Sequence, residues 1–331
     1  MPAPVSRLRM LYFLLVLGFV LLIKGADWLV DGATAIASRM GISDLIVGLT
    51  IVSMGTSLPE LIISVIASLN GSSDLAIGNV LGSNIANILL ILGITAIICE
   101  LPVQRNTILS ELPFSLAAAL LVGFLANSAL GSSPETALSI SRMDGLLILF
   151  FFFLFMVYIF LLAREDQQKK SAAPAGGAAA VPLQKSLFRI AAGVISLFLG
   201  GKWVVDGATH LAGLFGMSET FIGLTVVALG TSLPELVTSV LAALKKNTDI
   251  AVGNAIGSNI FNLLWILGIS AVIRPLPFNV ASNVDILAVV ASTCLIFLAL
   301  IIGRRFEIKR SEGVVFLLAY VAYLTYVVLR G

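Results

Sequence analysis

The chain has 331 residues, of which 59% are hydrophobic and only 11% are charged, and its net charge is +2. This composition is far from that of a soluble globular domain and is typical of a polytopic membrane protein. The near-neutral charge gives no sign of a nucleic-acid partner, so we expect the lipid bilayer to be the main surroundings of the chain.

Apolar runs near or above the ~20 residues needed to cross a bilayer occur ten times, five in each half. The alternating pattern of a membrane β-barrel strand is absent, so we predict an all-α polytopic membrane protein with ten transmembrane helices. The expected spans are 10–30, 45–69, 75–98, 108–127, 143–163, 187–213, 220–244, 250–273, 284–302 and 313–329.

The second span carries the sequence Gly-Thr-Ser-Leu-Pro-Glu-Leu, beginning at Gly55. Pro59 cannot donate a hydrogen bond to the carbonyl of Gly55, and its ring crowds that carbonyl, so we predict a break in this helix. Glu60 is costly at bilayer depth and is therefore a functional candidate that should face a protein-lined cavity. Thr56 lies four residues before Glu60 and can present oxygen to the same side.

The third span carries Ser83 and Asn87, again four residues apart, which predicts an oxygen-bearing stripe on one helix face. The neighbouring glycines and the amides of Asn79 and Asn84 are interpreted as packing residues that let helices approach closely. A segment rich in alanine and charged residues, 164–186, then follows the fifth span and reads as a flexible linker without a folded domain.

A shift of 175 residues aligns 28–102 with 203–277 without a gap, and more than half of the aligned pairs are identical. We therefore predict two five-helix repeats, 1–163 and 187–331, with core motifs at 53–93 and 228–268. The second copy of each candidate follows from the same shift: Thr231, Ser232, Glu235, Ser258 and Asn262, with Asn254 and Asn259 as the packing amides.

Five is an odd number of spans, so the second repeat must enter the membrane from the opposite side, which gives inverted repeats with breaks in helices 2 and 7. Most basic residues fall on the side of the linker, including Lys245 and Lys246, which align with Asn70 and Gly71. Basic loops mark the cytoplasmic side, so we expect an inner (plasma) membrane protein with a cytoplasmic linker and both termini outside.

Carboxylates, hydroxyls, amides and carbonyls, without a thiolate or histidine cluster, suit a hard cation. Calcium accepts ~6 to 8 oxygen ligands at flexible angles. Sodium is close to calcium in size, so both ions can compete for the same glutamates. We expect transported ions at this site and no bound cofactor, and the chain shows no catalytic signature of an enzyme.

The paired Gly-Thr-Ser-Leu-Pro-Glu and Gly-Ser-Asn-Ile motifs resemble the two repeats of the sodium/calcium exchanger family. This resemblance implies electrogenic exchange of three sodium ions for one calcium ion by a monomer, with the first and sixth helices sliding against the other eight. Some relatives, including potassium-dependent ones, carry aspartate where Asn262 stands, so potassium independence is expected. The resemblance also implies the following ligands: the carboxylates of Glu60 and Glu235, the carbonyls of Thr56 and Thr231, Ser57 with Ser83 and Ser232 with Ser258, the carbonyls of Ser53 and Ala228, and Asn87 with Asn262 at the centre.

Three other functions are compatible with buried acids. A proton-coupled cation exchanger would use the same glutamates, although its Gly-Asn signature is absent here. An intramembrane hydrolase is disfavoured because the chain has a single histidine, His210, and no Gly-x-Gly-Asp motif. A channel or scaffold is the simplest alternative. Asp31 and Asp206 are interpreted as helix-end residues rather than ion ligands.

Overall fold

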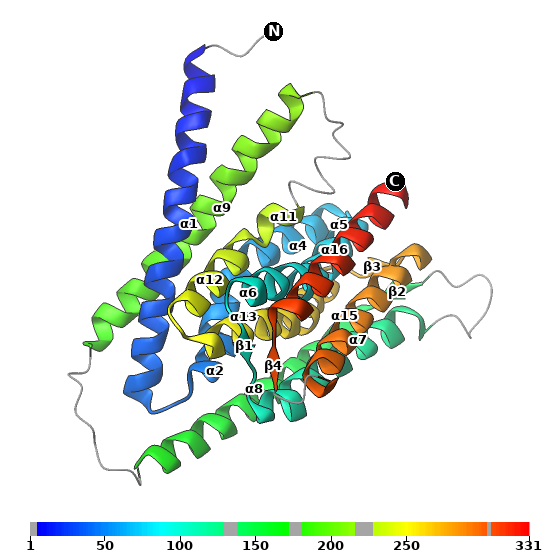
Figure 1. Ribbon diagram of the computed structural model, residues 1–331. Coiled ribbons are helices and arrows are strands. Elements are labelled where there is room, and N and C mark those ends of the chain that lie inside the picture. Colours follow the sequence, from blue (N-terminus) through cyan, green and yellow to red (C-terminus); the bar gives the residue numbers. More distant parts are fainter. Residues whose placement is uncertain (1–4, 129–137, 172–180, 216–227, 303–305, 331) are drawn as a thin grey trace.

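The structure, a computed structural model, describes residues 5–128, 138–171, 181–215, 228–302 and 306–330. Within these ranges the chain is almost entirely helical (Figure 1). Eight of the described helices are long and apolar enough to cross a membrane, and a bent pair raises this number to nine if it forms one span. The predicted all-helical polytopic membrane protein is confirmed.

The helices of the first half follow the expected spans in order. Short π-helical turns (η1 to η3) continue neighbouring α-helices rather than ending them. The elements are α1 (Val5–Met40), α2 (Asp44–Val47), η1 (Gly48–Val52), α3 (Ser53–Thr56), α4 (Leu58–Asn70), α5 (Ser73–Ile85), η2 (Ala86–Leu92), α6 (Gly93–Ile98), η3 (Thr107–Glu111), α7 (Leu112–Ala126) and α8 (Arg142–Ser171).

The second half repeats this order where it is described. The expected span 220–244 begins partly outside the described residues, and its described part consists of α11 and α12. The elements are α9 (Leu183–Leu214), α11 (Ala228–Thr231), α12 (Leu233–Leu244), α13 (Thr248–Ile260), the π-helical turn η6 (Phe261–Ile266), α14 (Leu267–Ile273), the 3₁₀ turn η7 (Val280–Ser282), α15 (Asn283–Ile302) and α16 (Arg310–Arg330).

Two pairs of two-residue strands join loops at the ends of the helices. Strand β1 (Leu101–Pro102) pairs antiparallel with β4 (Glu307–Ile308), and β2 (Ser139–Ile140) pairs antiparallel with β3 (Leu276–Pro277). The sequence did not predict these strands, because such short ladders depend on which loops meet in space. Strands β1 and β3 occupy equivalent positions in the two copies.

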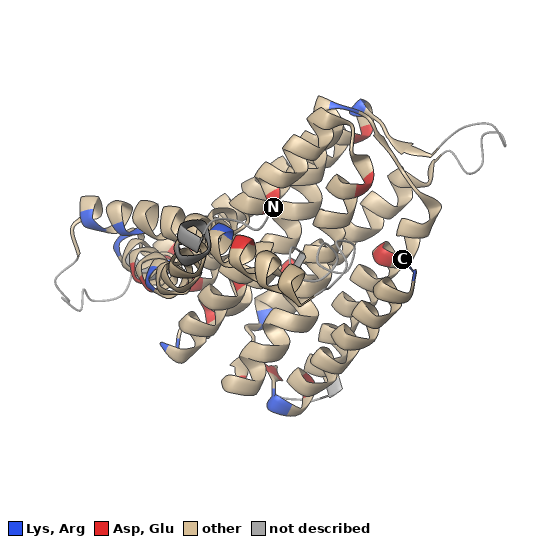
Figure 2. Cartoon of the chain, turned by 90° about the horizontal axis from the view of Figure 1, so that it is seen from above, with Lys and Arg blue, Asp and Glu red and all other residues tan. Residues whose placement is uncertain are grey.

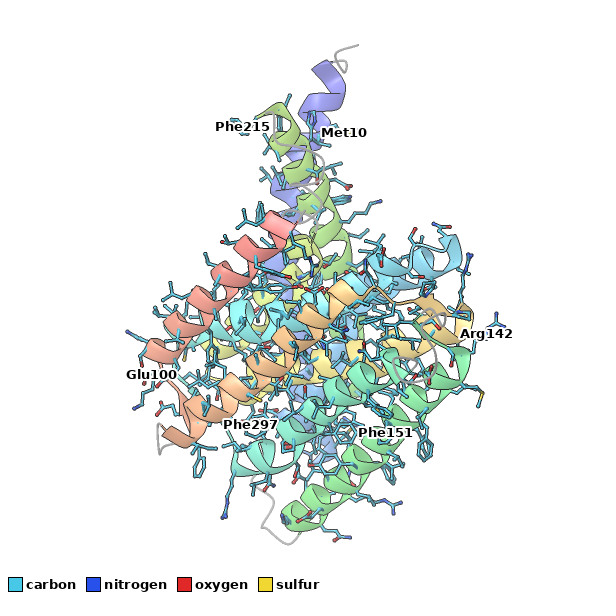
Figure 3. The ribbon with its side chains drawn as sticks, turned by 90° about the vertical axis from the view of Figure 1, so that its right-hand side faces the viewer. Met10, Glu100, Arg142, Phe151, Phe215 and Phe297 are labelled. Carbon is cyan, nitrogen blue, oxygen red and sulfur yellow. The ribbon has the colours of Figure 1, made fainter. Side chains whose placement is uncertain are left out.

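The helices that carry the repeated motifs lie at the centre of the body. In α5–α6 and α13–α14, 72% and 78% of the most apolar window is buried, against 22% in α8 and in α16. Acidic and basic residues occupy few positions along the helices (Figure 2). Large apolar side chains such as Phe150, Phe153 and Leu298 are exposed on the outer helices, next to the labelled Phe151 and Phe297 (Figure 3). Outer helices of this composition are suited to contact lipid.

Helices α1 and α9 form an antiparallel pair that extends beyond the body, with Met10 and Phe215 at its protruding end (Figures 1 and 3). Gly25 of α1 faces Gly193 of α9, where an added methyl group would lie 2.9 Å from the Gly193 carbonyl oxygen. Gly18 meets Gly200 in the same way. Glycine allows this close backbone approach because any side chain would separate the helices.

Candidate ion-binding site

Both repeated motifs interrupt a helix at their serine. Ser57 separates α3 from α4 with φ −84° and ψ 12°, and Ser232 separates α11 from α12 with φ −86° and ψ 4°. The two parts of the first helix are bent by 49°. Proline then occupies the first turn of the next helix, where its missing N–H costs no helical hydrogen bond. The predicted break at the first motif is therefore confirmed, and the described residues of the second copy show the same interruption.

The break places both glutamates in the first turn of a new helix. Glu60 lies in the first turn of α4 and Glu235 in the first turn of α12, and each is only 1% exposed. The partial positive charge at a helix N-terminus favours a carboxylate in this position. The helix break therefore partly offsets the cost of burying each charge.

The two motifs meet across the repeat. The Ser57 hydroxyl donates a hydrogen bond of 2.8 Å to Oε1 of Glu235. Thr56 lies beside the same carboxylate, and the equivalent Thr231 lies beside that of Glu60, together with Ser83. Each glutamate thus contacts the motif of the other copy, so the structure brings the two predicted half-sites into one site.

Several buried oxygens at this place have no hydrogen-bond partner of normal geometry among the described residues. Such atoms are costly to bury without a partner, and a bound cation would supply one. These oxygens belong to carboxylate, hydroxyl and carboxamide groups, which are the ligands that hard cations prefer. The atoms are Oε1 and Oε2 of Glu60, Oε2 of Glu235, Oγ of Ser232 and Ser258, and Oδ1 of Asn87 and Asn262.

Two candidates stand apart from the others. The Ser53 carbonyl already accepts the Ser57 amide at 3.0 Å and the Thr56 hydroxyl at 3.3 Å, while the Ser53 hydroxyl donates to the Leu49 carbonyl. Ala228 is the first described residue of α11, and its side chain lies outside the described residues. Their roles as carbonyl ligands stay predictions.

Residues that the sequence analysis assigned to packing hold the glutamate backbones. The Asn79 amide donates to the Glu60 carbonyl at 3.2 Å and to the Ser64 hydroxyl at 2.9 Å. The repeat-related Asn254 donates to the Glu235 carbonyl at 3.3 Å and to the Ser239 hydroxyl at 3.0 Å. The sequence could have indicated this role, because Glu60, Ser64 and Asn79 all recur at the equivalent positions of the second copy.

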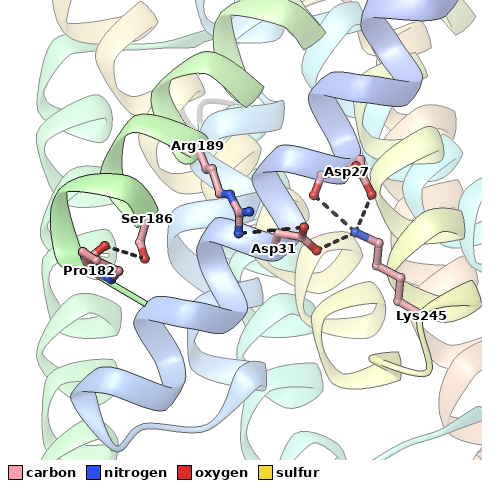
Figure 4. A network of polar contacts seen from close by, with 6 residues as sticks. All are labelled: Asp27, Asp31, Pro182, Ser186, Arg189 and Lys245. Atoms are coloured by element: carbon pink, nitrogen blue, oxygen red, sulfur yellow. Dashed lines mark hydrogen bonds and ion pairs between the residues drawn. The ribbon is translucent and has the colours of Figure 1, made fainter. Parts of the chain in front are cut away.

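Asp31 lies away from the glutamates, in a cluster of charged side chains on the side of the linker (Figure 4). The Lys245 ammonium is 2.6 Å from Oδ1 of Asp27 and 2.6 Å from Oδ1 of Asp31. Arg189 of α9 is 4.0 Å from the second oxygen of Asp31. Asp31 is therefore not an ion ligand here but joins α1 to the end of α12.

The family model for sodium/calcium exchanger proteins matches residues 10–161 and 185–329. The chain belongs to the sodium/calcium exchanger family. Within it, the chain is 36% identical to the sodium/calcium exchanger MaX1 of Methanosarcina acetivorans, over 95% of this chain and 97% of MaX1. It is 38% identical to the inner membrane protein YrbG of Escherichia coli (strain K12), over 94% of each chain.

The fold of this exchanger-family chain is similar to solved structures of the sodium-calcium exchanger NCX_Mj. One of them aligns with a TM-score of 0.78 and 31% sequence identity, over 97% of this chain and 99% of the other. The similarity therefore extends over nearly the whole chain, including both motifs.

Proposed function

We propose that this chain is a secondary antiporter that exchanges sodium for calcium across the membrane by alternating access. The observation that carries the proposal is that two buried carboxylates from different copies, Glu60 and Glu235, each lie beside the motif of the other copy, with unpaired oxygens around them. The relatives named as sodium/calcium exchangers support the same choice of ions.

The ligand chemistry favours calcium as one of the two ions. Calcium takes ~6 to 8 oxygen ligands at flexible angles, whereas magnesium requires a tighter octahedron and gives up its waters reluctantly. The site offers carboxylate, hydroxyl and amide oxygens from two helix breaks and from two neighbouring helices. Because sodium uses the same oxygens, binding of one ion excludes the other, and this competition couples their opposite movements.

Charge balance makes the exchange electrogenic. One calcium ion neutralises two ionised glutamates, whereas three sodium ions leave one excess positive charge. Each net charge moved across the membrane is worth ~2.3 kcal/mol per 100 mV. Asn87 and Asn262 add no further carboxylate, which agrees with an exchange that does not require potassium.

The topology that fits this function has ten spans in two inverted repeats, with a cytoplasmic linker, both termini outside and a monomer as the working unit. Contacts between equivalent helices of the two repeats support the inverted topology. Gly18 faces Gly200 and Gly25 faces Gly193, and the repeat shift converts one pair into the other. An antiparallel pair of equivalent helices is what an axis in the membrane plane produces.

Flux measurements on the purified protein in lipid vesicles test the proposal. Vesicles loaded with sodium should take up radioactive calcium from a sodium-free medium. A potential that is negative outside should accelerate this uptake, because three positive charges leave the vesicle for every two that enter. Potassium on either side should leave the rate unchanged once the potential is clamped. Calcium uptake that ignores sodium and follows a pH gradient would instead identify a proton-coupled exchanger.

A further inference from the structure

Four buried asparagine side chains join the two copies beside the site: Asn84 and Asn87 on one side, Asn259 and Asn262 on the other. Each is at most 1% exposed. The Asn84 amide donates to the main-chain carbonyl of Asn259 at 3.2 Å, and the Asn259 amide donates to the main-chain carbonyl of Asn84, also at 3.2 Å. These two residues therefore bind each other's backbone reciprocally.

The same two residues also accept hydrogen bonds from the other pair. The Asn262 amide donates to Oδ1 of Asn84 at 3.0 Å, and the Asn87 amide donates to Oδ1 of Asn259 at 3.0 Å. The oxygens Oδ1 of Asn87 and Asn262 accept no hydrogen bond from a described residue. Asn87 and Asn262 lie one helical turn after Ser83 and Ser258, on the stripe that borders the glutamates.

This order of contacts fixes which end of each amide faces the site. The two ends of an asparagine amide are nearly equal in shape, so hydrogen bonding alone decides its orientation. A main-chain carbonyl can only accept, so it sets the NH₂ group of Asn84 on its own side and presents Oδ1 of Asn84 to Asn262. That oxygen can only accept in turn, so Asn262 must turn its NH₂ group toward Asn84 and its oxygen away from it.

We propose that Asn84 and Asn259 are positioning residues that hold the carboxamide oxygens of Asn262 and Asn87 toward the transported cation. The inference rests on the proposed function, because it treats Asn87 and Asn262 as part of the ion site. Without Asn84, the Asn262 amide is free to turn and present its NH₂ group, a donor, to a cation. Calcium binding then weakens although every glutamate remains.

Replacing Asn84 by alanine should raise the KM for calcium about tenfold, which is the effect expected of one hydrogen bond of a buried amide. The maximal rate should change much less, because the substitution weakens ion binding. Asn259→Ala should act in the same way through Asn87, and it provides a second measurement if Asn84→Ala yields too little folded protein.

A double substitution separates positioning from packing. If Asn84 acts through the amide of Asn262, then Asn84→Ala should add no further rise in the calcium KM to that of Asn262→Ala. The matched control is Asn283→Ala, since Asn283 and Asn127 exchange two hydrogen bonds between α15 and α7 at 2.7 and 2.9 Å, away from the site. This control should leave the calcium KM unchanged.

An Asn84→Ala protein with an unchanged calcium KM, or a rise that simply multiplies that of Asn262→Ala, would overturn the positioning role. The same applies if Asn283→Ala raises the calcium KM as much as Asn84→Ala does. Failure of the proposed function has a different signature, because the unsubstituted protein would then show no sodium-dependent calcium uptake at all.

Discussion

Equivalent positions of the two copies make equivalent contacts at the centre of the molecule, but not at the two ends of the α1–α9 pair. At the centre, Asn79 and Asn254 hold the carbonyls of their glutamates at 3.2 and 3.3 Å, so the copies are alike. At the linker end, Lys245 joins α12 to Asp27 and Asp31 of α1. The hydrogen bonds that hold the glutamate backbones are thus duplicated, whereas the contact between the α1–α9 pair and the body is not.

The opposite end of the pair has no such connection. The positions equivalent to Lys245, Asp27 and Asp31 are Asn70, Lys202 and Asp206, and the described residues form no ion pair there. A cavity of about 310 Å³ between α4 and α9 is lined by Asp206 and by Thr231 of the site, whereas a cavity of about 480 Å³ beside Asp31 and Lys245 is lined by none of the described site residues. Among the described residues, the cavity on the side of the termini therefore reaches the site and the one beside Lys245 does not, so we expect Lys245 to help close the site toward the linker side.

The largest expected effect tests the symmetry of the centre. Glu60→Gln and Glu235→Gln should each reduce sodium-dependent calcium uptake by about 100-fold or more, because removing one buried charge leaves the bound ion uncompensated. The control is Glu100→Gln, since Glu100 is exposed between α6 and β1. Uptake above a tenth of the normal rate in either variant would contradict a site with two equivalent carboxylates.

The glycine contacts between α1 and α9 give the next largest effect. Gly25→Ala and Gly200→Ala occupy equivalent positions, and each added methyl group would meet a backbone carbonyl at 2.7 to 2.9 Å. Overpacking of this kind costs about 1–3 kcal/mol, so both proteins should unfold at lower temperature by similar amounts.

Gly213→Ala is the control for this pair of variants. Gly213 is on the same helix as Gly200, but no described atom lies within 4 Å of its added methyl group. Thermal unfolding in detergent should therefore be unchanged or slightly improved, because alanine favours a helix. Equal losses in all three variants would show that the contacts between the two helices do not matter.

Lys245→Ala should remove the ion pairs that distinguish the linker end of the α1–α9 pair from the other end. Its effect on calcium transport should be smaller. The two partly exposed ion pairs share one ammonium group, so together they contribute on the order of 1 kcal/mol, and their loss should shift the conformational equilibrium by about fivefold. The KM for calcium should rise on the side of the termini and fall on the linker side, because apparent affinity follows the fraction of molecules open to that side.

Oriented vesicles allow both KM values to be measured for this variant. Lys246→Ala is the control, since Lys246 is exposed and forms no ion pair with a described residue. The difference between Lys245→Ala and the unsubstituted protein should also shrink at high salt, which screens exposed ion pairs. KM values that move in the same direction on both sides would argue against a conformational role.

Asn70→Lys should give the smallest effect, about twofold, in the same direction as Lys245→Ala, because a new exposed ion pair at this end would weakly favour closure toward the side of the termini. The new ammonium group would be available to Asp206, as Lys245 is to Asp31. The two ends would then be more alike, and the KM for calcium on the two sides should become more nearly equal. No change in the ratio of the two KM values would show that the terminal-side cavity does not respond to charge.

The sequence predicted those parts of the fold that depend on local signals. Apolar length marked the spans, and Pro59 marked the break that the structure places at Ser57. The repeat also predicted which residues would meet, because any contact made in one copy is expected in the other. The repeat did not predict what the Asn79 amide binds, because the presence of an asparagine in a motif does not show which group its amide donates to.

Contacts between distant parts of the chain could not be predicted. Lys245 and Asp31 are 214 residues apart, and the alignment showed only that Lys245 replaces Asn70. Asp31 was therefore interpreted as a helix-end residue, and its partner was unknown. The sequence likewise predicts only a packing role for Asn84 and Asn259, because their reciprocal hydrogen bonds depend on the distance between two helices.

The glycine contacts of α1 and α9 have a mechanical consequence. Gly18 and Gly25 are seven residues apart, so the two points of backbone contact are separated by about 10 Å along the helix. Two helices fastened at two points cannot pivot about either one, so they move as a single lever. If the proposed exchange draws the pair toward α4 at one end, the movement would be transmitted to the other end and would pull α1 away from Lys245. Opening toward one side of the membrane and closing toward the other would then be one motion.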